Sequence, residues 1–215
     1  MLIVGTGNAA SCAALAALDN KVRVGMIEKA PQRDRGGNSA LTMHMRFAYD
    51  GIDDLRPLVK NMPEAELQKQ IARLPHRTQG EIWDEFMRTT NGRVDENLLQ
   101  VHVTEALPTV HWLAAKGHDW VPTGNVGDNI LMMNVGGYGL QQRSLSMMER
   151  SGATFHYEST AMELMQDHTG RVTGVRALTS TGLPRLTPKP WCWPVVGLKP
   201  TRKCARVISA PVGTW

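Results

Sequence analysis

Residues 1–15 read MLIVGTGNAASCAAL, and residues 22–30 read VRVGMIEKA. The apolar run 2–4 meets the glycine-rich turn 5–10, which has the form G-x-G-x-x-A and continues into an Ala-rich helix. A second apolar run, 22–27, ends at the acid Glu28. This order of strand, glycine turn, helix, strand and acid is typical of a dinucleotide-binding unit. The sequence therefore predicts an α/β fold: an incomplete Rossmann-like domain with a parallel sheet, crossover helices and a small antiparallel strand set.

Each position of the glycine turn has a role in holding a pyrophosphate. Gly5 permits the tight turn, and Gly7 leaves out a Cβ where the backbone approaches the phosphate. The N–H groups and the helix dipole at Asn8 and Ala9 face the negative charge. Ala10, where a third glycine is usual, still lets the helix pack closely on the strand. A purely structural unit with the same pattern is the alternative.

Glu28 lies about 20 residues beyond the turn, the distance at which a carboxylate accepts hydrogen bonds from ribose hydroxyls. The segment 29–31 then leads to a second glycine pair in Arg35-Gly36-Gly37-Asn38-Ser39. A nicotinamide domain normally continues straight into another crossover helix, whereas this chain makes a second close backbone approach. The pattern therefore favours FAD. A nicotinamide-dependent enzyme or a non-catalytic nucleotide-binding module is the alternative, and only residues 1–30 favour it.

The combination E-K-x-P followed by G-G-N-S resembles the flavoproteins of the fumarate reductase and succinate dehydrogenase type, over about residues 1–183. Within that family, the stretches RGGNS, MRFAYDG and GGYGLQQR look most like the tricarballylate dehydrogenase group. The resemblance also places the segment 160–162 at the adenine. It implies cofactor contacts by the pyrophosphate loop (Gly5, Gly7, Asn8, Ala9, Ala10), the ribose segment (Glu28, Lys29), the flavin stretch (Gly36, Gly37, Asn38, Ser39), Gly137 near the substrate cavity, and Ala161.

The same resemblance implies a chemistry. Some family members attach the flavin through a histidine, but that neighbourhood here reads Asn38-Ser39-Ala40, so we expect non-covalent FAD. In the family, hydride passes between flavin N5 and a carbon of a small di- or tricarboxylate substrate, and an electron-acceptor protein or a quinone-linked partner takes part. The family's catalytic residues and capping domain lie beyond the end of this chain, so none is assigned. Arg46 and Arg143 are candidate carboxylate contacts, with solvated or ion-paired arginines as the alternative.

Composition narrows the class of protein. Of the 215 residues, 42% are hydrophobic and 20% are charged, which is typical of a globular chain rather than a disordered one. No apolar run reaches the ~18 residues of a membrane span, and no signal peptide precedes the first strand. We therefore expect a cytoplasmic protein. The three cysteines are scattered and the histidines have no ligand spacing, so no metal site is expected.

The net charge of +4 comes from the end of the chain. Six basic residues and no acidic ones follow residue 183, so the positive excess belongs to residues 184–215 alone. A nucleic-acid-binding protein would need a basic face with helical or aromatic support. We therefore expect no nucleic-acid partner.

Periodicity and caps predict the remaining elements. We expect helices over 64–74 and 78–89, a third opening at Asp95, and a fourth starting at Pro108 and ending at residues 116–117. A glycine-rich entry, 134–140, introduces a helix that runs to Arg150. The resemblance places this entry near the cofactor and substrate cavity, and an ordinary loop is the alternative. Strands are expected over 154–157, 161–166 and 171–179, with a turn over 167–170.

Residues 184–215 differ in texture from the rest, and we expect 1–183 to be a partial FAD-binding domain followed by an out-of-frame tail. The tail holds six of the twelve prolines and three of the six tryptophans. When residues 189–194 are translated back to DNA and the reading frame is shifted by two bases, the shifted frame encodes Val-Leu-Ala whichever synonymous codons are used. G+C-rich codons extend this reading to AVVLACGGLEANPEMRARYLGAGGNL, which looks like the family's next segment. A Pro-rich linker or a basic anchor is the alternative. Sequencing the coding DNA tests the out-of-frame interpretation, which requires a single-base slip that restores an open frame.

Overall fold

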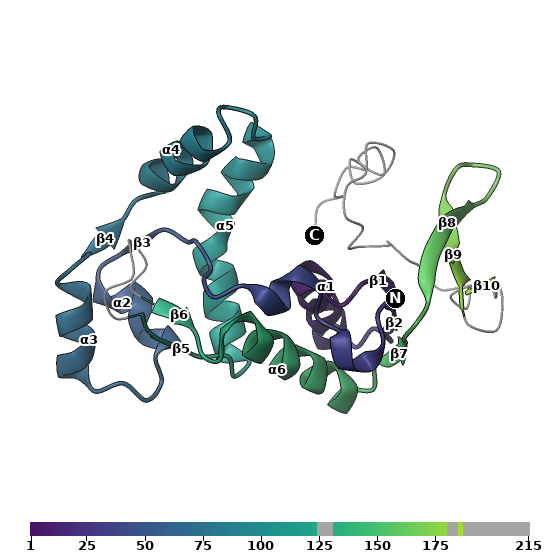
Figure 1. The fold of residues 1–215 in the computed structure, drawn as a ribbon, viewed down its shortest axis with the longest axis horizontal. Coiled ribbons are helices and arrows are strands. Elements are labelled where there is room, and N and C mark those ends of the chain that lie inside the picture. The colour runs from purple at the N-terminus through teal and green to yellow at the C-terminus, as the bar shows by residue number, and fades with distance from the viewer. Residues whose placement is uncertain (124–130, 180–184, 187–215) are drawn as a thin grey trace. The chain divides into compact units, whose positions relative to one another are not determined.

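The computed structural model describes residues 1–123, 131–179 and 185–186. Two units divide the chain: residues 1–40 together with the chain from 141 onward, and residues 41–140. In the first unit, β1 (Leu2–Val4), β2 (Gly25–Ile27) and β7 (Thr154–His156) form a parallel sheet in the order β1-β2-β7 (Figure 1). The helix α1 (Asn8–Asp19) connects β1 to β2. The predicted α/β fold is confirmed.

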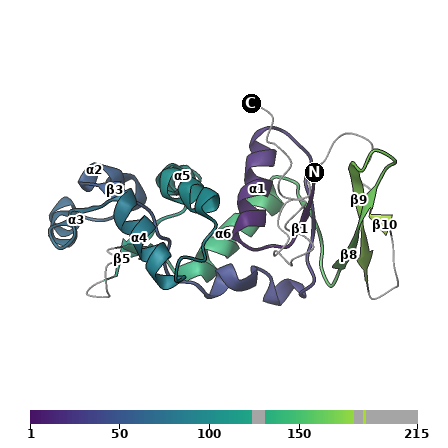
Figure 2. The same ribbon diagram turned by 90° about the horizontal axis from the view of Figure 1, so that it is seen from above.

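Small residues let α1 lie close to the sheet. Ala10 and Ala14 are buried on the helix, and Ile3 and Met26 are fully buried in β1 and β2. Figure 2 shows α1 on one side of β1 and the strands β8 and β9 on the other. The first unit therefore has three layers around a narrow sheet.

The third layer is the predicted antiparallel set. It consists of β8 (Thr160–Gln166), β9 (Val172–Leu178) and β10 (Arg185–Leu186), in the order β10-β9-β8. Val175 and Ala177 of β9 are buried against Leu2 and Ile27 of the parallel sheet. The Asp167 carboxylate closes the turn between β8 and β9 by accepting the Thr169 N–H at 2.9 Å.

The second unit is mainly helical. It contains the helices α2 (Ile52–Leu55), α3 (Glu64–Ile71), α4 (Gln79–Thr89) and α5 (Glu96–Ala115), the strand pair β3 (Tyr49–Asp50) and β4 (His76–Arg77), and the pair β5 (Trp120–Pro122) and β6 (Leu131–Met133). Ile82 of α4 packs on Leu99 and Val103 of α5 to form its core. The helix α6 (Gly136–Arg150) begins in this unit and continues into the first.

One helix prediction is wrong. Pro108 does not start a separate helix, because α5 runs without interruption from Glu96 to Ala115 with Pro108 inside it. The buried residues Leu99, Val103 and Val110 lie before and after the proline, so burial holds both halves in one helix. Tertiary packing therefore outweighs the helix-breaking tendency of proline.

The other predicted elements are found within a few residues of their expected bounds. The predicted stop after α5 is confirmed: Gly117 has a φ of +103°, and its N–H donates to the Ala114 carbonyl. The predicted out-of-frame tail, residues 184–215, lies outside the described residues except for β10. Among the helices that the structure describes, none is both long and apolar enough to cross a bilayer.

Candidate functional site

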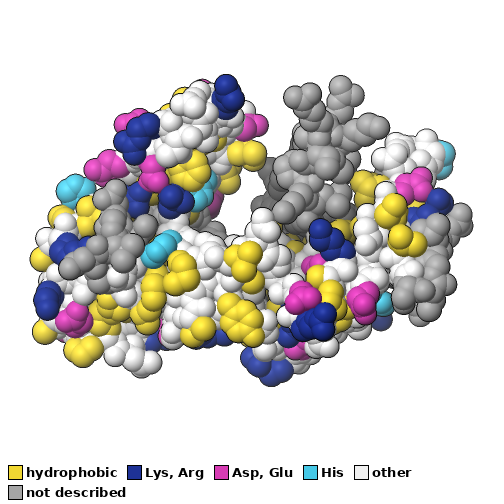
Figure 3. All heavy atoms as spheres, viewed as in Figure 1, with side chains coloured by type: hydrophobic (Ala, Val, Ile, Leu, Met, Phe, Trp, Pro, Cys, Tyr) yellow, Lys and Arg dark blue, Asp and Glu magenta, His cyan; other side chains and the backbone are white. Residues whose placement is uncertain are grey.

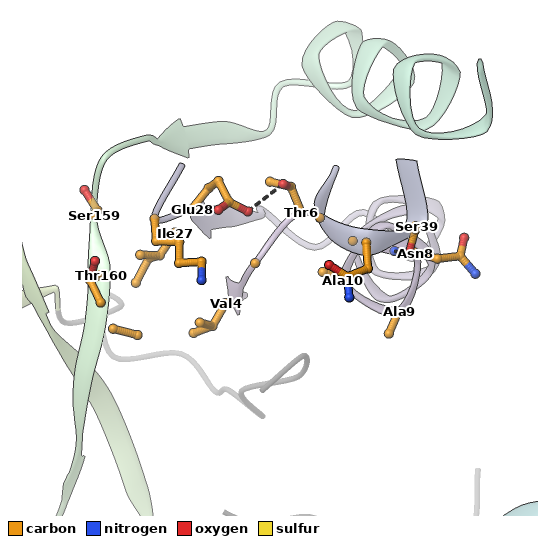
Figure 4. Close-up of a pocket in the computed structure, with 16 residues that line it drawn as sticks. Val4, Thr6, Asn8, Ala9, Ala10, Ile27, Glu28, Ser39, Ser159 and Thr160 are labelled. Atoms are coloured by element: carbon orange, nitrogen blue, oxygen red, sulfur yellow. Dashed lines mark hydrogen bonds between the residues drawn. The ribbon is translucent and has the colours of Figure 1, made fainter. Parts of the chain in front are cut away.

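A cavity of about 470 Å³ opens where β1 and β2 end, and all its lining residues belong to the first unit. The carboxyl ends of parallel strands are where α/β folds bind ligands. Figure 4 shows Asn8 and Ser39 toward one end of the cavity, Ser159 and Thr160 toward the other, and Thr6 beside Glu28 between them. The lining residues are Val4, Gly5, Thr6, Gly7, Asn8, Ala9, Ala10, Ile27, Glu28, Lys29, Gly37, Asn38, Ser39, Ser159, Thr160 and Ala161.

The first glycine turn has the geometry that its sequence predicts. Gly5 has a φ of +94°, which a residue with a side chain rarely adopts. Its N–H donates to the Ile27 carbonyl at 2.7 Å, so the turn is joined to the end of β2. Gly7 is the N-cap of α1 and offers no side-chain cap. The N-terminus of α1 therefore faces the cavity, and its first N–H, that of Asn8, donates to the Ser39 hydroxyl at 3.0 Å.

The second glycine turn lies against the first. A Cβ added to Gly7 would be 3.5 Å from the Ser39 hydroxyl oxygen and 3.8 Å from the Gly36 carbonyl oxygen. A Cβ added to Gly37, whose φ is +58°, would be 3.6 Å from the Gly7 Cα. The two glycine stretches, which are distant in the sequence, thus form one cradle of bare backbone.

Glu28 is 7% exposed, and both of its carboxylate oxygens accept hydrogen bonds. Oε2 accepts from the Thr6 hydroxyl at 2.6 Å, and Oε1 accepts from the Ala30 N–H at 2.8 Å. Each carboxylate oxygen has two lone pairs, so both retain capacity for a further donor such as a sugar hydroxyl. The carboxylate is therefore held in place while still able to bind.

Arg35 anchors the second glycine turn from its other side. Its side chain is 9% exposed, its guanidinium donates to the Tyr157 hydroxyl at 2.6 Å, and it forms an ion pair with Glu149 of α6. It also donates to Gln142 of α6 at 3.4 Å. Burial by itself lowers the pKa of Arg35, but the hydrogen bonds with Tyr157 and Glu149 outweigh burial and raise that pKa. The guanidinium is therefore a permanent charge.

The structure brings most of the predicted site residues together. All of them line the cavity except Gly36, which is buried, and Gly137. Gly137 lies at the start of α6 in the second unit, where its N–H donates to the Thr42 carbonyl. In the segment predicted at the adenine, Thr160 and Ala161 line the cavity, whereas Met162 is 59% exposed and does not.

Four lining residues are not predicted by any sequence pattern. Val4 and Ile27 are the last residues of β1 and β2, and Ser159 precedes β8, so their positions follow from strand ends rather than from a motif. One sequence feature could have pointed to Thr6, because it is the polar residue between the two glycines of the turn. Its role depends on contacts with Glu28 and Gly36, which no local pattern reveals.

The candidate carboxylate-binding arginines lie elsewhere. Arg46 forms an ion pair with Glu85 at 2.8 Å in the second unit, and Arg143 on α6 is not a lining residue. Among the described residues, no group of His, Cys, Asp and Glu side chains has the arrangement of a metal site. Figure 3 shows basic and acidic side chains interspersed on the face it displays.

Sequence comparisons give no match, either to a family model or to a curated protein. Solved structures share the fold. A flavocytochrome c3 fumarate reductase in its open conformation matches 86% of this chain with a TM-score of 0.62 at 19% identity. The 3-ketosteroid delta1-dehydrogenase of Sterolibacterium denitrificans gives a TM-score of 0.60 at 13% identity over 86% of this chain. Sdh1 of Mycobacterium smegmatis in complex with UQ1 gives 0.55 at 14% identity over 83%.

The chain spans less than half of each of these structures, namely 31%, 45% and 30% of their lengths. At these identities the similarity establishes the fold. The fold is thus one that a fumarate reductase and a steroid dehydrogenase share, and it places the cavity at the ends of β1 and β2.

Proposed function

We propose that this chain is the FAD-binding portion of a flavin-dependent dehydrogenase or reductase. One observation carries the proposal: the two glycine turns lie against each other beside a buried, hydrogen-bonded carboxylate. A dinucleotide needs both features, because its diphosphate requires bare backbone and its ribose requires an acceptor. The similarity to a flavocytochrome fold supports FAD over a nicotinamide cofactor.

The residues of the cavity fit such a cofactor. Gly5, Gly7 and the N-terminus of α1 would hold the diphosphate, and Glu28 would hold the adenosine ribose. The stretch 36–39 would lie beside the flavin, which we propose to be non-covalent, and Ala161 would lie at the adenine. When bound, the flavin supplies the hydride-transfer chemistry, while the protein binds and orients it.

We further propose that the substrate of the whole enzyme is a small di- or tricarboxylate of the tricarballylate type, with an electron-acceptor protein or a quinone-linked partner. The RGGNS, MRFAYDG and GGYGLQQR stretches support this class of substrate. Its carboxylates would need cationic clamps, and the cavity that we assign to the dinucleotide has Lys29 as its one cationic side chain among the described residues. We also propose that the 215-residue chain itself does not turn over a carboxylate.

Titration of the purified chain with FAD tests the binding proposal. Bound flavin absorbs near ~450 nm and its fluorescence changes on burial, so both signals should saturate with FAD. NADH titrated under the same conditions should not compete. Saturable NADH binding without FAD binding would contradict the proposal. Dye reduction dependent on tricarballylate, measured with the 215-residue chain and excess FAD, would contradict the proposed lack of turnover.

A further inference from the structure

The hydroxyl group of Thr6 joins three separate segments. Thr6 is completely buried between the two glycines of the first turn. Its oxygen lies 2.6 Å from Glu28 Oε2 and 2.9 Å from the Gly36 backbone nitrogen. One hydroxyl thus contacts the end of β2 and the second glycine turn at the same time.

The direction of both hydrogen bonds is fixed by chemistry. The Gly36 N–H can only donate, so the Thr6 oxygen accepts from it. The hydroxyl proton is then free for the Glu28 carboxylate, which accepts it in a short, charge-assisted bond. Because donating a proton makes a hydroxyl oxygen a better acceptor, the two bonds strengthen each other.

The Gly36 end of this chain of bonds is tightly confined. Gly36 has a φ of +109°, and a Cβ added there would lie 3.1 Å from the Ala40 Cβ and 3.3 Å from the Gln141 Cβ. Its carbonyl oxygen lies 3.8 Å from the position that a Gly7 Cβ would take. The Gly36 backbone is therefore confined by the Ala40 and Gln141 side chains on the side that a Cβ would occupy.

We propose that Thr6 is a positioning residue that couples Glu28 to the second glycine turn. This inference rests on the proposed function, because Glu28 is there the ribose acceptor and 36–39 the flavin-side stretch. Binding of the ribose at Glu28 and placement of the stretch 36–39 become one event, transmitted through the Thr6 hydroxyl. Among the described residues, Thr6 is the side chain that hydrogen-bonds to both Glu28 and Gly36.

Hydrogen exchange at the Gly36 amide of the full chain without ligand tests the coupling directly. Thr6→Val keeps the shape of the side chain but removes the hydroxyl, and should speed exchange about 10-fold, the effect of losing one buried hydrogen bond. Thr6→Ser keeps the hydroxyl and should stay within about twofold of the natural chain. Thr173→Val removes an exposed hydroxyl on β9 and is the matched control.

A double-mutant cycle separates coupling from a merely local contact. Glu28→Ala removes no atom that hydrogen-bonds to Gly36, yet it should also speed Gly36 exchange, because the Thr6 hydroxyl loses its acceptor. Combined with Thr6→Val, it should add less than the sum of the two single effects. Full additivity of the two substitutions would overturn the coupling.

The FAD affinity gives the second readout. Thr6→Val should weaken FAD binding about 10-fold and Thr6→Ser should restore it. If the natural chain does not bind FAD, the proposed function fails, whereas the exchange cycle still decides the role of Thr6. Unchanged Gly36 exchange in Thr6→Val would overturn the inference. If circular dichroism shows that Thr6→Val is unfolded, the smaller Thr6→Ala takes its place in the same cycle.

Discussion

The backbone N–H of Asn8 donates a hydrogen bond to the hydroxyl oxygen of Ser39, 31 residues further along the chain, at 3.0 Å. Asn8 is the first residue of α1, and the N-cap of that helix, Gly7, has no side chain to cap it. Ser39 thus supplies, from the second glycine turn, an acceptor for one of the N–H groups at the start of α1 that have no partner within the helix. The second glycine turn therefore also provides a hydrogen-bond acceptor for the first N–H of α1.

Ser39→Ala should therefore lower the free energy of unfolding by about 0.5–2 kcal/mol, the usual cost of losing a helix cap. Urea unfolding followed by circular dichroism measures this change. Asn38→Ala is the matched control, because Asn38 is an exposed neighbour and surface changes of that kind stay within about 0.5 kcal/mol. Equal stability of the two variants would show that Ser39 does not cap α1.

Gly7→Ala should separate binding from folding. Gly7 has a φ of −73°, which alanine adopts readily, and the added Cβ would have only ordinary contacts at 3.5 and 3.8 Å. The fold should therefore tolerate the substitution, while the methyl group occupies the place where a diphosphate approaches the backbone. We expect FAD affinity to fall at least about 10-fold with little change in Tm.

Gly80→Ala is the control for Gly7→Ala. Gly80 lies in the first turn of α4, where the nearest atom to an added Cβ is the Thr78 hydroxyl oxygen at 3.9 Å. Alanine there should stabilise the chain by about 0.5–1 kcal/mol and leave FAD affinity unchanged. If both variants bind FAD as the natural chain does, Gly7 is not part of a diphosphate site.

Arg35→Ala should destabilise the first unit. The side chain is 9% exposed, and its guanidinium hydrogen-bonds to Tyr157, Gln142 and Glu149, so its removal leaves partly buried acceptors unpaired. A loss of about 1–3 kcal/mol is expected in urea unfolding. Arg35→Lys keeps the charge but not the planar fork of donors, so its stability should lie between those of the natural chain and Arg35→Ala. Arg33→Ala, whose side chain is 86% exposed, should change stability little; a loss equal to that of Arg35→Ala would contradict this account.

The sequence was sufficient to predict the parts of the site that are local. The glycine turn, α1 and the acid at the end of β2 each follow from residues within one short segment, and the structure has them there. The contact between Gly7 and the second glycine turn depends on tertiary folding, so the sequence predicted two close backbone approaches but not that they meet. Thr6 escaped for the same reason, since both its partners are distant in sequence.

The acid dependence of α4 follows from its capping box. Thr78 donates from its N–H and its hydroxyl to the Glu81 carboxylate, and these bonds lower the pKa of Glu81. A carboxyl with a lowered pKa in the folded state adds stability above its unfolded pKa of about 4.3, and this is lost as pH falls through the folded value. The stability difference between the natural chain and Glu81→Ala should therefore shrink between pH 6 and pH 3.

Urea midpoints of both chains at these two pH values measure the effect. Glu105→Ala serves as the control, because Glu105 is an exposed carboxylate on α5 with no hydrogen bond among those the structure describes. The stability of this control chain at the two pH values gives the background for the Glu81→Ala comparison. A difference for Glu81→Ala that persists unchanged at pH 3 would mean that the ionised carboxylate is not what caps α4.

Replacing Pro108 distinguishes a continuous α5 from two separate helices, because the two arrangements predict different changes in stability. If Pro108 began a separate helix, proline would suit that first position and replacing it would bring no gain. In the continuous α5, Pro108 is exposed and leaves the Thr104 carbonyl without its helical partner N–H. Pro108→Ala should then stabilise the chain by about 1–3 kcal/mol, measured in urea against Thr109→Ala at the neighbouring exposed position. Because both variants introduce alanine, a gain confined to Pro108→Ala would come from the restored hydrogen bond, and its absence would contradict a continuous helix.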